Sequence, residues 1–283
     1  MKRLLKMSMI LIMCLTVVFA FTVSVNAASV TKVSNAKQFC NIGKSNGGTY
    51  KLTKDIKLSR KNYLTINKNK TYTINLNGHK ITANPGKTSQ SYNGPITIRK
   101  GTLKITNSVK KTGRIRSYEY EGITMTGGKL YTNARVEIYC EHASGKGTGI
   151  QMYDNSTLYA KAGDIWGRST GVSMFGGKLY TYGAETKTFP TIVGHDKNGL
   201  SVMGSNTQLV LKGGIFGTMS EEQFCYPISD MSKSQTPLIS DGYEFLNKDL
   251  KHVDVTTESS GSRYVNGTID TTGLNWVAIF PVG

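Results

Sequence analysis

The chain has 283 residues, with 35 Lys or Arg against 18 Asp or Glu and a formal net charge of +17 at pH 7. This length suits one large domain, and its four cysteines lack the spacing of a disulfide framework or of a zinc site. The charge favours polyanionic partners, among them acidic glycans, anionic envelope polymers, anionic membrane surfaces and nucleic acid. It is equally well explained as a means of keeping the protein soluble.

Residues 1–27 have the pattern of a secretory signal peptide. Three basic residues come first, the apolar stretch Met7–Val25 follows, and small residues lead to Ala27, after which we expect cleavage. A retained membrane anchor is the alternative. Removal of residues 1–27 leaves 32 basic residues (35 − 3) against 18 acidic ones, a net charge of +14 (32 − 18).

The segment Ser34–Ile42 predicts a short helix near the start of the domain. It opens with residues of N-cap type, places Phe39 and Ile42 on one side, and precedes the helix-breaking pair Gly47–Gly48. An apolar side on so short a helix suggests a cap over an apolar surface. Residues 49–58 then supply a first, partial coil.

A repeated pattern begins at Leu64 and recurs six times: an apolar pair around one polar residue, a short turn, a second such triplet, and a lone isoleucine near glycine. The first triplets are Leu64–Ile66, Ile96–Ile98, Ile123–Met125, Ile150–Met152, Val172–Met174 and Leu200–Val202. The second triplets are Ile74–Leu76, Leu103–Ile105, Leu130–Thr132, Leu158–Ala160, Leu179–Thr181 and Leu209–Leu211. The closing isoleucines, which we expect to point inward, are Ile81, Ile115, Ile138, Ile165, Ile192 and Ile215.

Alternation with a period of two predicts short strands with one buried face, and self-similarity at 20 to 50 residues predicts a repeat architecture. Three short strands per repeat, with glycine at the corners, fit a solenoid whose equivalent strands stack in parallel about 4.8 Å apart. We therefore predict an all-β parallel β-helix of about six coils over residues 28–217, capped by the short helix.

Residues 218–283 leave the repeat pattern, yet they are too apolar for a disordered tail. Tyr243, Phe245, Trp276 and Ile279 are among their apolar residues. Because the end of a solenoid exposes unpaired strand edges and core, we interpret this segment as a C-terminal cap packed on the helix.

Three segments carry a resemblance to a known family: Gly48–Leu58, Ile74–Ile81 and Leu211–Gly217. They resemble the secreted right-handed parallel β-helix repeat proteins of Gram-positive bacteria, which have the pectin-lyase-like fold. The resemblance implies a right-handed helix in a protein exported by bacteria. Because no wall-sorting motif and no terminal hydrophobic segment is visible, we expect the mature chain to be secreted or held noncovalently at the bacterial cell surface. The resemblance also implies either a surface module with a glycan-related role or a polysaccharide lyase or hydrolase, and the fold alone does not choose between them.

One outward position of the second triplets is aromatic on consecutive coils, where Tyr131, Tyr159 and Tyr180 follow one another. Tyr153 and Phe175 form a second aromatic column across the corner, and Lys129 and Lys178 precede the strand on the same side. Aromatic rings beside cations are typical of surfaces that hold acidic sugars. We therefore predict a ligand-binding strip of these seven residues, with structural stacking of the tyrosines as the alternative.

Candidate catalytic residues lie in the central coils: Asp154, Asp164, Arg168, His195 and Asp196. A lyase needs a base and a neutralising cation, whereas a hydrolase needs two carboxylates facing one bond. The adjacent aspartates and the Arg-x-Lys motif that polygalacturonases carry are not found, and neither is a calcium-binding acidic cluster. We predict no cofactor and no metal site.

The polar centres of the first triplets form a hydroxyl-rich outward column: Thr65, Thr97, Thr124, Gln151, Ser173 and Ser201. Cys140 continues the alternation of Val136 and Ile138, so we expect a buried thiol. The sequence leaves a disulfide bond between Cys40 and Cys225 as an alternative to two free thiols. The sequence thus favours a secreted, monomeric, noncatalytic module that binds acidic glycans or an anionic cell-envelope polymer. It has no specific nucleic-acid motif and no transmembrane segment in the mature chain. A polysaccharide lyase or glycoside hydrolase and a structural surface rod without ligand are the alternatives.

Overall fold

The computed structural model describes residues 29–59, 63–84, 94–142, 144–183, 188–220, 222, 225–233 and 237–282. The predicted signal peptide, residues 1–27, lies outside these ranges. In the described part of the chain no helix is long and apolar enough to cross a membrane.

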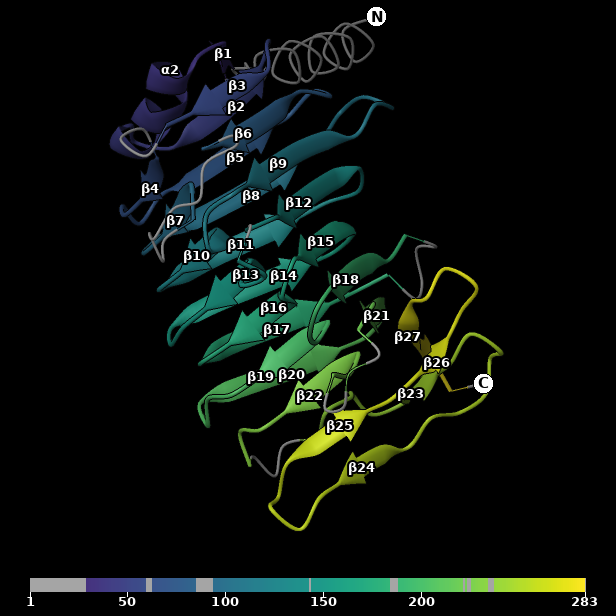
Figure 1. The fold of residues 1–283 in the computed structure, drawn as a ribbon. Coiled ribbons are helices and arrows are strands. Elements are labelled where there is room, and N and C mark those ends of the chain that lie inside the picture. Colours follow the sequence, from purple (N-terminus) through teal and green to yellow (C-terminus); the bar gives the residue numbers. More distant parts are fainter. Residues whose placement is uncertain are drawn as a thin grey trace, which may run out of the picture.

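The chain forms three long sheets, stacked as the sides of a β-solenoid of about six turns (Figure 1). Sheet A contains, in spatial order, β1 (Val30–Val33), β2 (Gly48–Leu52), β5 (Thr71–Asn75), β8 (Thr102–Thr106), β11 (Gly128–Thr132), β14 (Ser156–Ala160), β17 (Gly177–Thr181) and β20 (Thr207–Leu211). Sheet B contains β3 (Ile56–Leu58), β6 (Lys80–Ala83), β9 (Gly113–Ser117), β12 (Val136–Cys140), β15 (Gly163–Gly167), β18 (Pro190–Gly194), β21 (Gly214–Thr218), β27 (Asn275–Pro281) and β23 (Tyr243–Leu246). Sheet C contains β4 (Leu64–Ile66), β7 (Ile96–Ile98), β10 (Glu121–Met125), β13 (Thr148–Met152), β16 (Thr170–Met174), β19 (Leu200–Val202), β22 (Ile228–Asp230), β25 (Arg263–Val265) and β24 (Val255–Thr257).

Each coil adds one strand to sheet C, then to sheet A, then to sheet B, and equivalent strands pair in parallel. Ile123 of β10 lies between Ile96 and Ile150 of the neighbouring coils, and all three side chains are fully buried. The predicted all-β parallel β-helix and its inward first triplets are therefore confirmed. Burial of one such aliphatic side chain stabilises the fold by roughly 1.5–3 kcal/mol.

The predicted register is wrong at two places. In the first full coil Tyr72 and Ile74 pair with Leu103 and Ile105, so that Thr73, and not Asn75, is the outward residue between them. The sequence pattern favoured Ile74 and Leu76 because both are apolar and one polar residue separates them. Leu76 is indeed buried, but it lies in the turn that follows the strand.

The second error concerns the last closing isoleucine. Ile192 pairs with Phe216, which is fully buried, whereas Ile215 is only half-buried. The preceding glycines, Gly213 and Gly214, have φ values of 143° and 119°. Glycine adopts such φ values readily and other residues rarely do. The two glycines therefore give the backbone a conformation before this strand that shifts the inward position by one residue.

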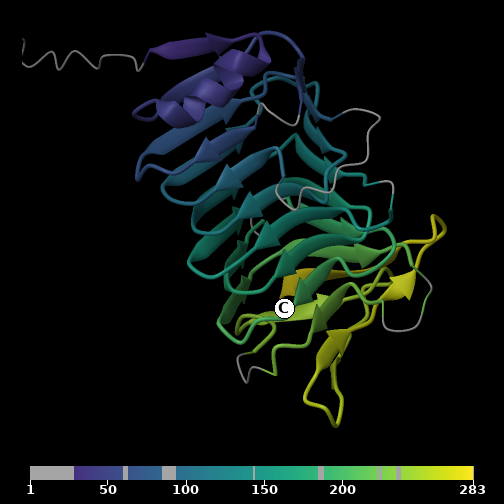
Figure 2. The same cartoon turned by 60° about the vertical axis from the view of Figure 1, so that its left-hand side comes forward.

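The N-terminal end of the solenoid is covered as predicted. Helix α2 (Ala36–Asn41) and the 3-10 turn η1 (Ile42–Lys44) lie over it (Figure 2). Asn35 is the N-cap, and its side chain accepts a hydrogen bond of 3.0 Å from the backbone N–H of Gln38. Phe39 and Ile42 point into the core and are buried.

The C-terminal end is closed by antiparallel strands. In sheet C, β22 continues the parallel stack and β25 and β24 follow it in antiparallel pairing. In sheet B, β27 pairs antiparallel with β21, β23 lies beyond it, and β26 (Thr268–Ile269) also pairs with β27. Phe245, Val277 and Ile279 are buried against the last coil, as expected of a cap.

The three cysteines of the described residues are free thiols. Cys140 is fully buried, as predicted, and burial strongly raises the pKa of its thiol. The bond between Cys40 and Cys225 that the sequence left open is not formed.

Candidate functional site

The outward face of sheet A carries the predicted strip, in three parallel rows. The central row is Val30, Thr49, Thr73, Lys104, Tyr131, Tyr159, Tyr180 and Val210. One flanking row is Thr71, Thr102, Lys129, Thr157, Lys178 and Gln208. The other row begins with Lys32, Lys51, Asn75 and Thr106 and continues just past the strand ends with Asn133, Lys161, Tyr182 and Lys212. We call this surface the lysine–tyrosine face.

The strands that build this face carry lysines without carboxylates between them. The eight strands of sheet A contain five lysines and no Asp or Glu. Sheet B differs, since its exposed Arg114 pairs with Glu137 at 2.8 Å and Arg116 pairs with Glu141. The positive potential is therefore concentrated on sheet A, where an anion meets cations that are not already paired within the sheet.

The tyrosines form a continuous stack. The ring centroids of Tyr131 and Tyr159 are 4.3 Å apart with an interplanar angle of 8°, and those of Tyr159 and Tyr180 are 5.0 Å apart at 15°. The ammonium groups of Lys104 and Lys161 lie 5.7 and 5.8 Å from the centroid of Tyr131. Both faces of Tyr159 are thus occupied, and the stack leaves ring edges and phenol hydroxyls for a ligand.

The phenol of Tyr159 remains protonated at neutral pH. Burial raises the pKa of Tyr159 above its usual range, and the neighbouring Tyr131 raises it further. Burial likewise raises the pKa of Tyr182 on the adjoining row. A neutral phenol retains the O–H that donates to an anionic oxygen, so these groups complement the lysine cations.

Tyr153 and Phe175 belong to a different surface from the tyrosine stack. They stack with centroids 5.6 Å apart at the turn that follows β13 and β16, where sheet C gives way to sheet A. Phe175 forms part of the wall of a groove over sheet C. The seven predicted binding residues therefore divide into five on the lysine–tyrosine face and two at its margin.

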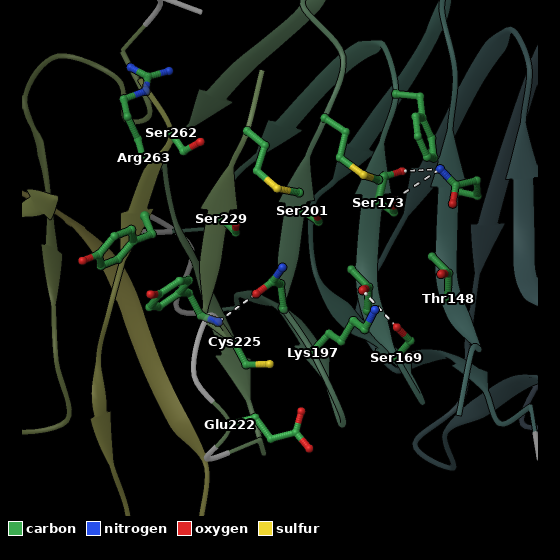
Figure 3. A pocket seen from close by; sticks show the side chains of 18 of the residues that line it. Thr148, Ser169, Ser173, Lys197, Ser201, Glu222, Cys225, Ser229, Ser262 and Arg263 are labelled. Carbon is green, nitrogen blue, oxygen red and sulfur yellow. Dashed lines mark hydrogen bonds between the residues drawn. The ribbon is translucent and has the colours of Figure 1, made fainter. Parts of the chain in front are cut away.

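The groove over sheet C has a volume of about 630 Å³ and a floor of hydroxyl and amide side chains (Figure 3). Gln151, Ser173, Ser201 and Ser229 lie along this floor, one from each successive coil. Most of the predicted hydroxyl-rich column is buried, since Thr97, Thr124, Gln151, Ser173 and Ser201 are each at most 7% exposed.

Aromatic residues and a buried ion pair close the far end of the groove. The rings of Tyr226 and Tyr264 stack with centroids 4.1 Å apart. Nε of Arg263 donates to the Asp230 carboxylate at 3.1 Å, and that carboxylate is 1% exposed. The ion pair joins β25 to β22, so the terminal hairpin is a fixed end wall.

The structure brings together three of the five catalytic candidates. Asp196 accepts from Nε of Arg168 at 2.9 Å, and its other oxygen lies 2.6 Å from Nδ1 of His195. These residues lie in the connections from sheet B to sheet C. Both oxygens of the carboxylate are engaged, which favours a structural ion pair over a free base.

The other two candidates lie elsewhere. Asp164 is on the outward face of sheet B beside Glu137, where burial raises the pKa of its carboxyl. Asp154 is in the turn between β13 and β14 and lines a shallow hollow with Thr157 and Lys178. The five residues therefore form no single constellation, and Asp196 has no second carboxylate of the predicted set beside it.

Sequence reasoning missed five lysines of the face. Lys32, Lys51 and Lys104 lie at outward positions within strands. Lys161 and Lys212 come one residue after a strand and continue its outward alternation, and this alternation is the signal that could have found all five. It also missed Glu119 and Glu121, two buried carboxyls between β9 and the start of β10.

Among the described residues no group of three or more His, Cys, Asp or Glu side chains is arranged to hold a metal ion. The chain matches no model of a known protein family, no curated protein and no solved structure.

Proposed function

We propose that this protein is a secreted, noncatalytic β-helix module that binds acidic glycans or another anionic polymer of the cell envelope. The observation that carries the proposal is the lysine–tyrosine face, where five of eight adjacent strands hold a lysine and none of the eight holds a carboxylate. An extended polyanion binds such a surface more tightly than a single anion does, because many weak contacts act together.

The geometry of the tyrosine stack supports recognition by charge and not by ring stacking. Since Tyr131 and Tyr180 cover the faces of Tyr159, sugar rings do not stack there. We assign recognition to ammonium groups and phenol hydroxyls, which pair with anionic oxygens. The polymer is therefore chosen by its charge, and uncharged glycans of the same length bind more weakly.

The experiment measures retention of the mature chain, residues 28–283, on acidic and neutral polysaccharides, with ultraviolet absorbance of unsaturated uronates and release of reducing ends followed in parallel. The test variant is Lys129→Ala with Lys178→Ala. The matched control is Lys57→Ala with Lys80→Ala, which removes two exposed lysines from sheet B.

Retention on acidic polymers that falls in the test variant and persists in the control supports the proposal. Absence of retention on every polyanion contradicts it and leaves a structural surface rod. Product formation would replace it with an enzyme, and substitution of Arg168, His195 and Asp196 would then be the next step.

A further inference from the structure

We infer that the anionic polymer lies along the solenoid axis and meets one lysine per coil, on alternating sides of the tyrosine stack. This inference rests on the proposed function and defines the ligand of the same surface. The ligand is a linear, extended polyanion with roughly one charge per 5 Å, the spacing of stacked strands, and with successive charges pointing to opposite sides.

The register of sheet A carries the inference. Five consecutive strands each contribute one lysine: Lys104 with β8, Lys129 with β11, Lys161 with β14, Lys178 with β17 and Lys212 with β20. Lys104 lies in the central row at the end of the stack. Lys129 and Lys178 lie in one flanking row, separated by Thr157.

Lys161 and Lys212 lie in the opposite flanking row, separated by Tyr182. Their preceding residues, Ala160 and Leu211, both align with Thr181. The backbone N–H groups of Lys161 and Lys212 continue the interstrand hydrogen bonds by one step, at 3.2 Å each. From Lys129 onward the side that carries the cation therefore alternates at every coil.

The position across the stack from each flanking lysine is neutral and able to hydrogen-bond. On the first flank these positions are Thr157 and Gln208, and on the second they are Asn133 and Tyr182. All five lysine side chains are exposed. A chain with all its charges on one side would meet only half of the flanking lysines, whereas a chain of alternating charges meets each one.

The span of the strip gives a length for the ligand. Four steps separate β8 from β20, which is about 19 Å at roughly 4.8 Å a step. Affinity should therefore rise with each added charge up to about five. A longer ligand should gain further affinity only because it can bind in more than one register along the strip.

The decisive experiment moves one charge across the stack without changing the net charge. Thr157→Lys with Lys161→Ala places three consecutive lysines on one flank. Gln208→Lys with Lys212→Ala places a lysine directly beside Lys178 on the same flank, at the end of the strip where fewer cations are adjacent. It replaces the first variant if that one fails to fold. Far-UV circular dichroism and thermal unfolding verify each fold, and size-defined oligomannuronates, with one carboxylate on every sugar, serve as the probe.

We expect each relocation to weaken binding about two- to fivefold, the loss of one exposed ion pair, and we expect the affinity of unaltered protein to level off near five sugars. Hyaluronan oligosaccharides of equal charge number, with a carboxylate on every second sugar, should bind more weakly. Unchanged affinity in a folded relocation variant, or affinity with no dependence on charge spacing, would overturn the inference and leave the proposed function intact. Failure of every polyanion to bind would instead remove the proposed function, and this inference with it.

Discussion

Tyr159 stacks on Tyr131 with ring centroids 4.3 Å apart and planes 8° from parallel, so these two side chains link adjacent coils on the outside of the solenoid. The same rings present hydroxyls to a ligand. Stability and binding therefore depend on different atoms of one residue, and substitution can separate them.

Tyr159→Phe keeps the ring and removes the hydroxyl, so we expect near-normal thermal stability with weakened retention on acidic polymers. Tyr159→Ala removes both and should lower the free energy of unfolding by about 1 kcal/mol for the lost ring pairing alone, with a further cost for lost burial. Urea unfolding and affinity electrophoresis measure the two effects. Equal loss of stability in both variants would contradict the division.

Ile150→Asp places an unpaired carboxylate in the core between Ile123 and Val172. We expect a loss of at least about 3 kcal/mol, as for other uncompensated buried charges. Because every coil packs on its neighbours, hydrogen exchange should accelerate together in β10, β13 and β16. Lys57→Asp on the exposed surface of β3 is the control and should leave exchange in these strands unchanged.

Glu121 predicts a pH dependence of stability. Burial raises the pKa of its carboxyl from 4.5 to about 7 in the folded protein, and Thr124 donates a hydrogen bond to it. The folded state thus binds a proton that the unfolded state releases, so the contribution of Glu121 to stability is fully present below pH 4.5 and is lost as pH rises through about 7. The full contribution is of the order of 3 kcal/mol.

Glu121→Gln keeps a hydrogen-bonding partner for Thr124 and removes the titration. Its free energy of unfolding should change less between mildly acidic and mildly alkaline solution than that of the unaltered protein. Urea titrations at the two pH values provide the comparison. A parallel dependence in both proteins would assign the effect to other groups, such as Asp164, whose carboxyl pKa is also raised by burial.

Arg263→Met leaves the buried carboxylate of Asp230 without its cation, a change that typically costs about 3–5 kcal/mol. We expect the hairpin of β24 and β25 to detach, and its amide protons to exchange faster, while β10 and β13 stay protected. Adding Asp230→Asn should restore part of the protection, because the neutral amide still accepts from Ser232. An additive loss in the double variant would refute a coupled pair.

Much of the fold could be predicted because alternation and repetition are local signals, visible in triplets such as Ile123–Met125. The register could not be read where a second buried residue competes for the inward position, as Leu76 does with Tyr72. Burial of the outward Thr124 and Gln151 was equally hidden, since alternation along a strand does not reveal what covers its outward side. Thr124 contacts Glu121 and the backbone of Gly94, and Gln151 lies in the groove over sheet C.

The surface residues were predictable to the extent that they repeat within strands. Tyr131, Tyr159 and Tyr180 share one register position, and the structure places them in one stack. Residues in connections have no such constraint, which explains why Asp154 and Asp196 lie at opposite ends of the sheet C strands although both belong to central coils.

The segment from Thr148 to Ser169 is one complete coil, because Thr148 aligns with Thr170 of the next. Duplicating it in frame would insert another rung into all three sheets at once and lengthen the charged strip by one step. Deleting it would shorten the strip by the same amount. The number of coils is thus a modular variable through which gene duplication, or a protein engineer, could adjust avidity without designing a new contact.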